Sequence, residues 1–153
     1  MENISAVSLG EAMPIMLDML KNGNMVSLVV KGGSMYPFLI SGRDKVLLSS
    51  VNKPVKRGDI VLYKTRTDKY VLHRVSRVDN NGNLEIIGDG QLVADYPVQP
   101  DAVVAVACRV IRKGKEINRR SIRWMMFSNP LFLKFSRKYF VKRAIKKGSE
   151  ADD

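Results

Sequence analysis

The sequence contains very little histidine and cysteine. Among its 153 residues there is one of each, His73 and Cys108. One cysteine excludes an intrachain disulfide, and one histidine with one cysteine argues against a zinc site. We therefore expect neither a metal nor an organic cofactor. Cys108 ends the apolar run 103–108, which predicts a small buried side chain.

The sequence also lacks a long hydrophobic run. No segment reaches the roughly 18 apolar residues that a transmembrane helix requires. Glu2, Glu11 and Asp18 stand where a secretory signal would need a basic region and then an unbroken apolar stretch. These features predict a cytoplasmic protein, or one bound peripherally at the inner membrane surface.

Acidic residues are scarce only in the C-terminal part of the chain. Residues 1–108 hold 12 lysines and arginines against 11 acidic residues, whereas residues 109–153 hold 14 against 4. The formal net charge of +11 therefore belongs almost entirely to the C-terminal region. This distribution indicates a nearly neutral body with a basic extension, and it argues against a protein built throughout for nucleic acid.

Hydrophobic periodicity divides the chain into three segments. Residues 1–24 contain apolar residues at helical spacing, and 25–118 contain short period-two runs separated by turn signals. Residues 119–153 form a basic, aromatic-containing extension, with a helix start at Ser128-Asn129-Pro130. The predicted fold is mainly β: an antiparallel body with an N-terminal helix and a basic C-terminal helix.

One motif suggests a positioned nucleophile. Ser34 follows Gly32 and Gly33, precedes Met35 and Pro37, and comes after an apolar run with strand character. Taken alone, a Gly-Gly-Ser is more often an ordinary turn. A serine hydroxyl near its free pKa is a poor nucleophile, so chemistry at this position also requires a base and a group that orients the base.

Three further segments supply candidates for those roles. His73 lies in a strand-like run, which by itself more often marks a structural histidine, and Asp89 and Asp95 follow it in segments that also read as turns. The order of Ser34, the segment 57–61, His73 with Arg74, and the two aspartates resembles the successive motifs of the signal peptidase I and SOS-repressor superfamily.

The resemblance covers about residues 25–113. It is closest to the archaeal and endoplasmic-reticulum type of signal peptidase, which has histidine where common bacterial enzymes have lysine. It implies a serine peptidase in which Ser34 is the nucleophile, His73 the base and Asp95 the acid that orients the base. Asp89 is then a second carboxylate that shapes the loop, and it is the alternative to Asp95 as the orienting acid.

The chain departs from the resembled family at two points. Signal peptidases commonly have a serine two positions before the nucleophile, where this chain has Gly32, a feature shared with the SOS-repressor branch. We also expect no membrane anchor, since the sequence contains no apolar run long enough to form one. A non-catalytic peptide-binding module and a self-cleaving regulator of the same fold therefore stay open as alternatives to a peptidase that cleaves a separate peptide or leader sequence.

The expected partner is a peptide or protein substrate. Gly32 and Gly33 are expected to let the Ser34 amide approach a developing oxyanion, while Met35 and Pro37 are expected to shape the nucleophile turn and line the cleft. Residues 119–147 are expected to pack on the body or to bind an anionic membrane surface, with five aromatic side chains as candidates for insertion: Trp124, Phe127, Phe132, Phe135 and Phe140. Nucleic acid is the less favoured partner, since no recognised binding motif accompanies the charge.

Overall fold

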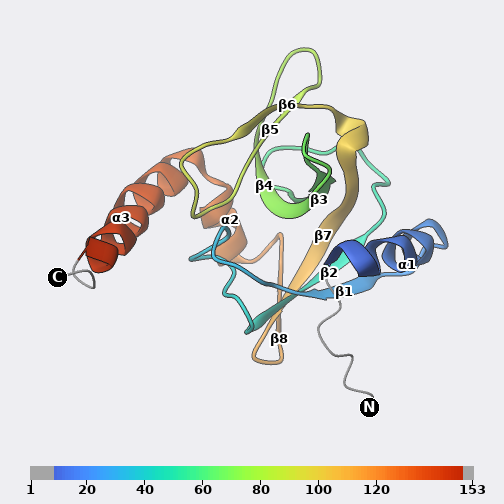
Figure 1. The fold of residues 1–153 in the computed structure, drawn as a ribbon, viewed down its shortest axis with the longest axis horizontal. Helices are drawn as coiled ribbons and strands as arrows, with labels where there is room; N and C mark the ends of the chain where they lie inside the picture. Colours follow the sequence, from blue (N-terminus) through green and yellow to red (C-terminus); the bar gives the residue numbers. More distant parts are fainter. Residues whose placement is uncertain (1–8, 150–153) are drawn as a thin grey trace.

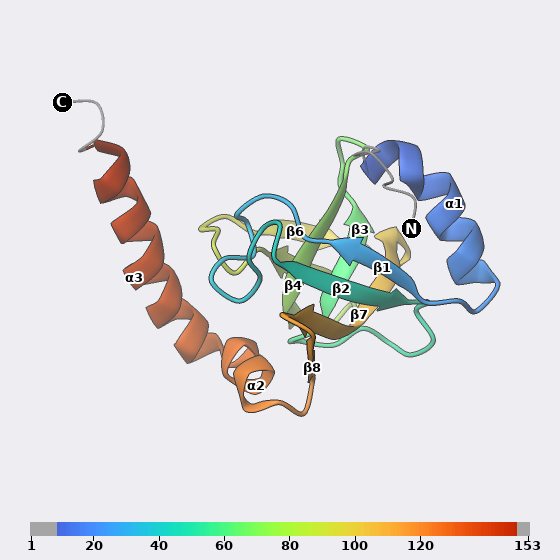
Figure 2. The same ribbon diagram turned by 90° about the horizontal axis from the view of Figure 1, so that it is seen from below.

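A computed structural model describes residues 9–149 of the chain. The ends of the predicted segments 1–24 and 119–153 lie outside these residues. The protein is mainly β, as predicted: the strands form one antiparallel sheet, with helix α1 (Leu9–Lys21) before it and helices α2 (Ile122–Ser128) and α3 (Pro130–Ser149) after it. Figures 1 and 2 show α1 and α3 at opposite ends of this sheet.

Within residues 9–149, the sheet has eight strands. Seven follow the spatial order β1-β2-β7-β3-β4-β5-β6, and β8 pairs with β7. The first and last strands of this order, β1 and β6, each have one edge without a strand partner. The bounds are β1 Val26–Val29, β2 Asp44–Ser49, β3 Ile60–Lys64, β4 Tyr70–Val78, β5 Leu84–Ile87, β6 Asp95–Val98, β7 Val103–Arg112 and β8 Lys115–Asn118.

Two hydrophobic clusters hold the sheet and helices together. Alternate residues of a strand face opposite sides of the sheet, so one strand can contribute to both clusters. Ile60 and Leu62 of β3 belong to the larger cluster, which also includes the buried residues of α1, α2 and the start of α3. Val61 and Tyr63 of the same strand belong to the smaller cluster, which is built from strands β3 to β7. Strand β3 is therefore buried on both faces in the middle of the molecule.

The C-terminal region contains two helices where the sequence suggested one. Ser121 caps α2, accepting a hydrogen bond from the Trp124 amide, and Pro130 occupies the first position of α3. Trp124 and Phe127 are buried against Phe38, with ring centroids 5.6 and 5.1 Å away. The prediction that these two aromatic residues insert into a membrane is therefore wrong, because the protein core already covers them.

Other sequence-based expectations also need correction. The predicted buried Cys108 is only half buried, and its thiol donates a hydrogen bond to the Leu47 carbonyl. Strands β6 and β8 were not anticipated from the sequence. Among residues 9–149, no helix combines the length and apolar character needed to cross a bilayer.

Candidate active site

Ser34 and His73 lie together although 39 positions separate them in the chain. The Oγ atom of Ser34 is 3.1 Å from Nε2 of His73. Ser34 lies on the turn after β1, whereas His73 lies within β4 and pairs with Val61 of β3. The structure thus brings the proposed nucleophile within hydrogen-bonding distance of the proposed base.

The other nitrogen of His73 faces a residue that the sequence analysis missed. The hydroxyl of Tyr63 is 3.4 Å from Nδ1 of His73 and donates a hydrogen bond of 2.5 Å to Oδ2 of Asp95. Asp95 was predicted to orient the imidazole directly. The structure instead places the tyrosine hydroxyl between the acid and the base, so the hydrogen bonds that link Asp95 to the ring pass through Tyr63, while the charge of Asp95 also acts on the ring directly.

This arrangement selects one form of the imidazole. The Asp95 carboxylate only accepts hydrogen bonds, so the Tyr63 hydroxyl donates to it and its oxygen accepts from Nδ1–H of His73. Nε2 is then free to accept the Ser34 proton. Burial raises the pKa of Tyr63, and the nearby Asp95 raises it further, so the phenol keeps its proton at neutral pH.

Burial has the opposite effect on the histidine. Desolvation lowers the pKa of His73 from its ordinary value of 6.5, and the negative charges of Asp95 and Asp89 oppose this change only in part. A buried imidazolium is disfavoured because the protein interior solvates charge poorly. The neutral ring, which is the form that accepts a proton, therefore predominates at neutral pH.

Asp89 has a different partner. Both of its carboxylate oxygens accept hydrogen bonds from Arg74, each at 2.8 Å, and both side chains are almost completely buried. Arg74 also donates to the carbonyl of Gly58 and lies over the ring of Phe38, 4.8 Å from its centroid. Asp89 thus anchors its loop to β4 and makes no hydrogen bond to His73.

The anchored loop supports the nucleophile turn directly. The amide of Gly90 donates a hydrogen bond of 2.9 Å to the carbonyl of Ser34. At Gly88, a Cβ atom would lie only 2.3 Å from the same carbonyl oxygen, so this close approach requires glycine. The Gly-Asp-Gly sequence therefore has a physical role: its glycines allow contact with Ser34, and its aspartate fixes the loop.

The four other predicted turn residues have distinct environments. Gly32 has a φ of +80° and its amide donates to the Ser41 hydroxyl, whereas Gly33 has open space beside its Cα and an ordinary φ. Met35 is buried and lines the cavity beside Ser34. Pro37 is half buried in the turn and does not line that cavity, so the expectation that it lines the cleft is wrong.

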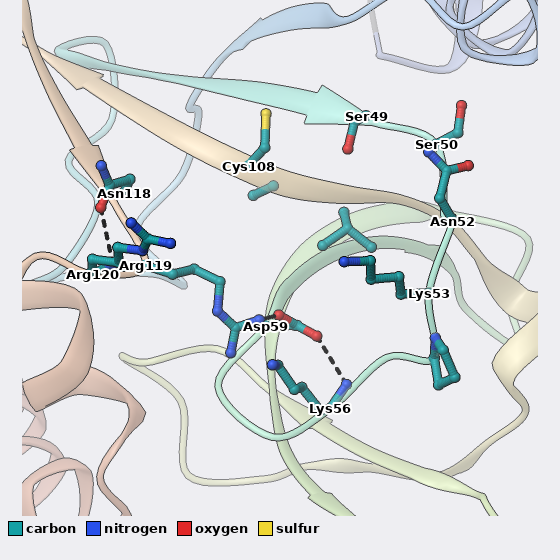
Figure 3. Close-up of a pocket in the computed structure, with 13 residues that line it drawn as sticks. Ser49, Ser50, Asn52, Lys53, Lys56, Asp59, Cys108, Asn118, Arg119 and Arg120 are labelled. Carbon is teal, nitrogen blue, oxygen red and sulfur yellow. Dashed lines mark hydrogen bonds and ion pairs between the residues drawn. The ribbon is translucent and has the colours of Figure 1, made fainter.

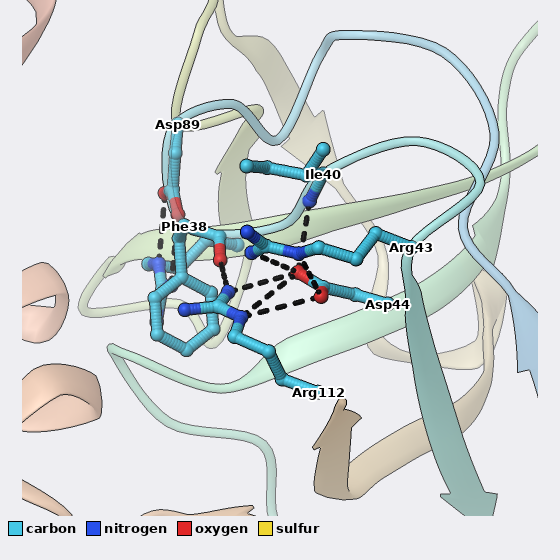
Figure 4. Close-up of polar contacts among 7 residues, drawn as sticks. Phe38, Ile40, Arg43, Asp44, Asp89 and Arg112 are labelled. Atoms are coloured by element: carbon cyan, nitrogen blue, oxygen red, sulfur yellow. Dashed lines mark hydrogen bonds and ion pairs between the residues drawn. The ribbon is translucent and has the colours of Figure 1, made fainter. Parts of the chain in front are cut away.

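The end of the turn is held by a charged cluster (Figure 4). Arg112 of β7 donates hydrogen bonds to the carbonyl of Phe38 and to Asp44, and Asp44 also accepts one from the Ile40 amide. Burial tends to raise the pKa of Asp44, but the hydrogen bonds from Arg43 and Arg112 outweigh it and hold the pKa well below its usual range. The ionised Asp44 carboxylate thus links the turn to the sheet through hydrogen bonds.

A cavity of about 440 Å³ opens beside Ser34 and His73. Most of its wall is apolar and comes from α1, β1 and the first half of β4. The pairing of β4 with β5 begins only at Arg74, so residues 70–73 have no strand partner on that edge. The wall-forming side chains are Leu9, Ala12, Leu28, Val29, Val30, Met35, Val71 and Leu72, with Tyr70 beside them.

A larger cavity of about 730 Å³ lies elsewhere and is basic (Figure 3). Lys53, Lys56 and Arg119 line it around Asp59, which forms an ion pair with Arg119. Neither Ser34 nor His73 lines this space, so we place the candidate active site in the smaller cavity. Within the described part of the chain, no cluster of three or more histidine, cysteine or acidic side chains is suited to hold a metal ion.

Comparison with known families supports this assignment of the fold. A family model described as Peptidase S24-like matches residues 2–111, more than two thirds of the chain. The chain belongs to the Peptidase S24-like family. This finding confirms the predicted signal peptidase I and SOS-repressor superfamily, while the closer likeness to the archaeal and endoplasmic-reticulum type stays a prediction. No curated protein matches the chain.

The Peptidase S24-like match covers only part of the structure. It contains Ser34, Tyr63, His73 and both aspartates, together with α1 and the strands from β1 through most of β7. Strand β8 and helices α2 and α3 lie beyond it. The basic C-terminal region is therefore an addition to the part of the chain that defines the family.

Proposed function

We propose that this Peptidase S24-like protein is a serine endopeptidase that cleaves a peptide or leader sequence by nucleophilic attack of Ser34. The observation that carries the proposal is the 3.1 Å separation between Ser34 Oγ and His73 Nε2. A nucleophile within hydrogen-bonding distance of a neutral imidazole, itself oriented by a third group, meets the requirement for covalent catalysis.

In the proposed reaction, Ser34 Oγ attacks the scissile carbonyl while its proton passes to Nε2 of His73. The imidazolium then donates that proton to the leaving amine, which departs as the acyl-enzyme forms. Water, deprotonated by the same imidazole, attacks the ester and releases the second product. Tyr63 and Asp95 hold the ring in the required tautomer and stabilise its transient positive charge.

Backbone amides supply the proposed oxyanion site. The amide of Ser34 donates no hydrogen bond to another part of the described chain, so it is available to a developing negative charge. Gly32 has no side chain to serve as an additional donor, and its amide is taken by Ser41. We therefore assign the principal donor role to the Ser34 amide.

The substrate is proposed to bind as an extended strand. Strand β1 has one edge without a strand partner, residues 70–73 of β4 have another, and both contribute to the wall of the cavity beside Ser34. An extended peptide adds main-chain hydrogen bonds to such edges, while pockets beside them select its side chains. The mostly apolar wall favours small or apolar residues next to the scissile bond.

Cleavage of a peptide library, read by mass spectrometry, tests the proposal. We expect Ser34→Ala to lower the cleavage rate by at least about a thousandfold. Ser76→Ala is the matched control, because Ser76 lies on the same strand as His73 but donates to Glu85 and does not line the cavity. Equal cleavage by the wild type and Ser34→Ala would refute the proposed nucleophile.

The same experiment separates the two alternative functions. Peptide binding without cleavage by the wild-type protein would assign a peptide-binding module. Loss of mass from the chain itself during incubation, prevented by Ser34→Ala, would assign self-cleavage. Cleavage of added peptides by an intact chain is the outcome that the proposal predicts.

A further inference from the structure

An exposed apolar stripe runs along the outer face of α3. Leu131, Phe135 and Tyr139 follow one another at four-residue spacing, and their exposed fractions are 78%, 68% and 53%. Residues four apart lie on one side of a helix. Helix α2 adds three further exposed apolar side chains, Ile122, Met125 and Met126. We call these six residues the outer stripe.

The outer stripe is separate from the face by which α3 contacts the body. Leu133 and Ser136 are buried, and the ring of Phe140 packs edge-on against Tyr36, with 5.7 Å between centroids. Helix α3 therefore has two apolar faces, which explains why its apolar and charged residues do not separate into two halves around the helix. Figure 2 shows α3 projecting from the sheet.

Cations border the outer stripe. Lys134, Lys138 and Lys142 repeat at the same four-residue spacing and are all exposed. At 100° per residue, this row lies directly beside the row of Leu131, Phe135 and Tyr139. The whole segment 119–149 contains ten lysines and arginines and no acidic residue.

We propose that α2 and α3 dock the protein on an anionic lipid surface, with the outer stripe entering the headgroup region and the lysine row binding anionic headgroups. Exposed apolar residues next to lysines are the pattern by which helices lie in a membrane interface. A second copy of the chain fits this face less well, because it would bring another ten cations against the first ten. Nucleic acid would leave the apolar row without a partner.

Of the five aromatic residues that the sequence suggested for insertion, the proposal keeps only Phe135. Trp124 and Phe127 are core residues, so insertion falls to Leu131, Phe135 and Tyr139. The contact between Phe140 and Tyr36 places α3 beside the nucleophile turn, so docking would hold that turn close to the lipid surface. Binding itself does not depend on Ser34 being a nucleophile.

Co-sedimentation of the full chain with vesicles tests the proposal. We expect binding to vesicles of phosphatidylcholine mixed with phosphatidylglycerol, weaker binding in high salt, and little binding to phosphatidylcholine alone. Replacing Lys134, Lys138 and Lys142 together by Gln should weaken binding roughly a hundredfold, since each lysine near an anionic surface contributes a factor of roughly five. The charge-matched control replaces the exposed residues Lys45, Lys69 and Lys115 by Gln and should bind as the wild type does.

A second set of variants tests the apolar stripe. Replacing Leu131, Phe135 and Tyr139 together by Ser should reduce vesicle binding by more than about tenfold. Its control, Ile15→Ser with Met19→Ser, changes exposed residues of α1 at the other end of the sheet and should leave binding unchanged.

Three outcomes would overturn the proposal. The first is equal binding by the two lysine variants, which would show that only net charge matters. The second is a stable dimer of the wild type that dissociates in the triple Ser variant, which would assign the stripe to self-association. The third is tighter, salt-sensitive binding to an RNA or DNA duplex than to anionic vesicles.

Discussion

Replacing Tyr63 by Phe gives the sharpest test of how His73 is oriented. The change removes one hydroxyl, which contacts Nδ1 of His73 at 3.4 Å and Asp95 at 2.5 Å, and leaves the buried ring in place. Asp95 is exposed, so its carboxylate gains water as a partner. The expected loss of folding free energy is therefore small, about 1 kcal/mol.

The expected effect on catalysis is larger. A hydrogen bond to a charged group contributes about 1.5–3 kcal/mol, and the 3.4 Å distance to His73 argues for the lower end of that range. The His73 ring is charged only while it holds the Ser34 proton, so the loss falls on kcat. A loss of about 1.5 kcal/mol corresponds to a roughly tenfold lower kcat, with KM nearly unchanged.

The assay is steady-state cleavage of a peptide identified from the library. Tyr96→Phe is the matched control, because it also removes a tyrosine hydroxyl bonded to an aspartate, Asp79, at 2.9 Å. In a double-mutant cycle, Tyr63→Phe and Asp95→Asn should be strongly non-additive, since both break one hydrogen-bonded chain. Wild-type kcat in Tyr63→Phe together with a large loss in Asp95→Asn would refute the intermediate position of the tyrosine.

Three further predictions follow from the site. Gly88→Ala should destabilise the fold by about 1–3 kcal/mol in urea denaturation and lower kcat, because the new Cβ meets the Ser34 carbonyl at 2.3 Å, whereas Gly10→Ala, with open space, should do neither. Ala12→Phe should fill part of the cavity and raise KM with little change in kcat, and an unchanged KM would place the substrate elsewhere. The acid limb of kcat/KM should have its midpoint below 6.5, because burial lowers the pKa of His73 and the neutral ring is the active form; a midpoint above 6.5 would contradict this.

The same lowered pKa predicts a dependence of stability on pH. The unfolded chain binds a proton at His73 near pH 6.5, whereas the folded chain binds it only at lower pH. The contribution of His73 to stability is therefore present above the unfolded pKa and is lost as pH falls below it. His73→Gln should show a smaller loss of stability between neutral and mildly acidic pH, as measured by urea denaturation.

Local sequence patterns were sufficient to predict most of the strands. Strands β4 and β5 coincide with two short runs of strand-forming residues, 70–78 and 84–87, that turn signals separate. Strand β6 escaped prediction because Pro97 lies within it, and proline normally interrupts strands. The structure places β6 at an edge of the sheet, which is where a strand accommodates proline.

The candidate site was predictable only in part. The motifs named Ser34 and His73, which the fold brings into contact. The intermediate position of Tyr63 depends on strand register: Val61 pairs with His73, so Tyr63, two residues along β3, lies diagonally beside the histidine on the same face. The pairing of Asp89 with Arg74 is likewise a tertiary contact, which no local pattern in the sequence encodes.

The proposed mechanism requires that His73 activates Ser34, and covalent labelling measures this directly. A serine-directed phosphonate reagent should add one adduct per chain, located on Ser34 by peptide mapping. His73→Ala should slow that labelling by at least about a hundredfold, because the general base is lost. No adduct on Ser34 in the wild type, or equally fast labelling in His73→Ala, would contradict the central claim.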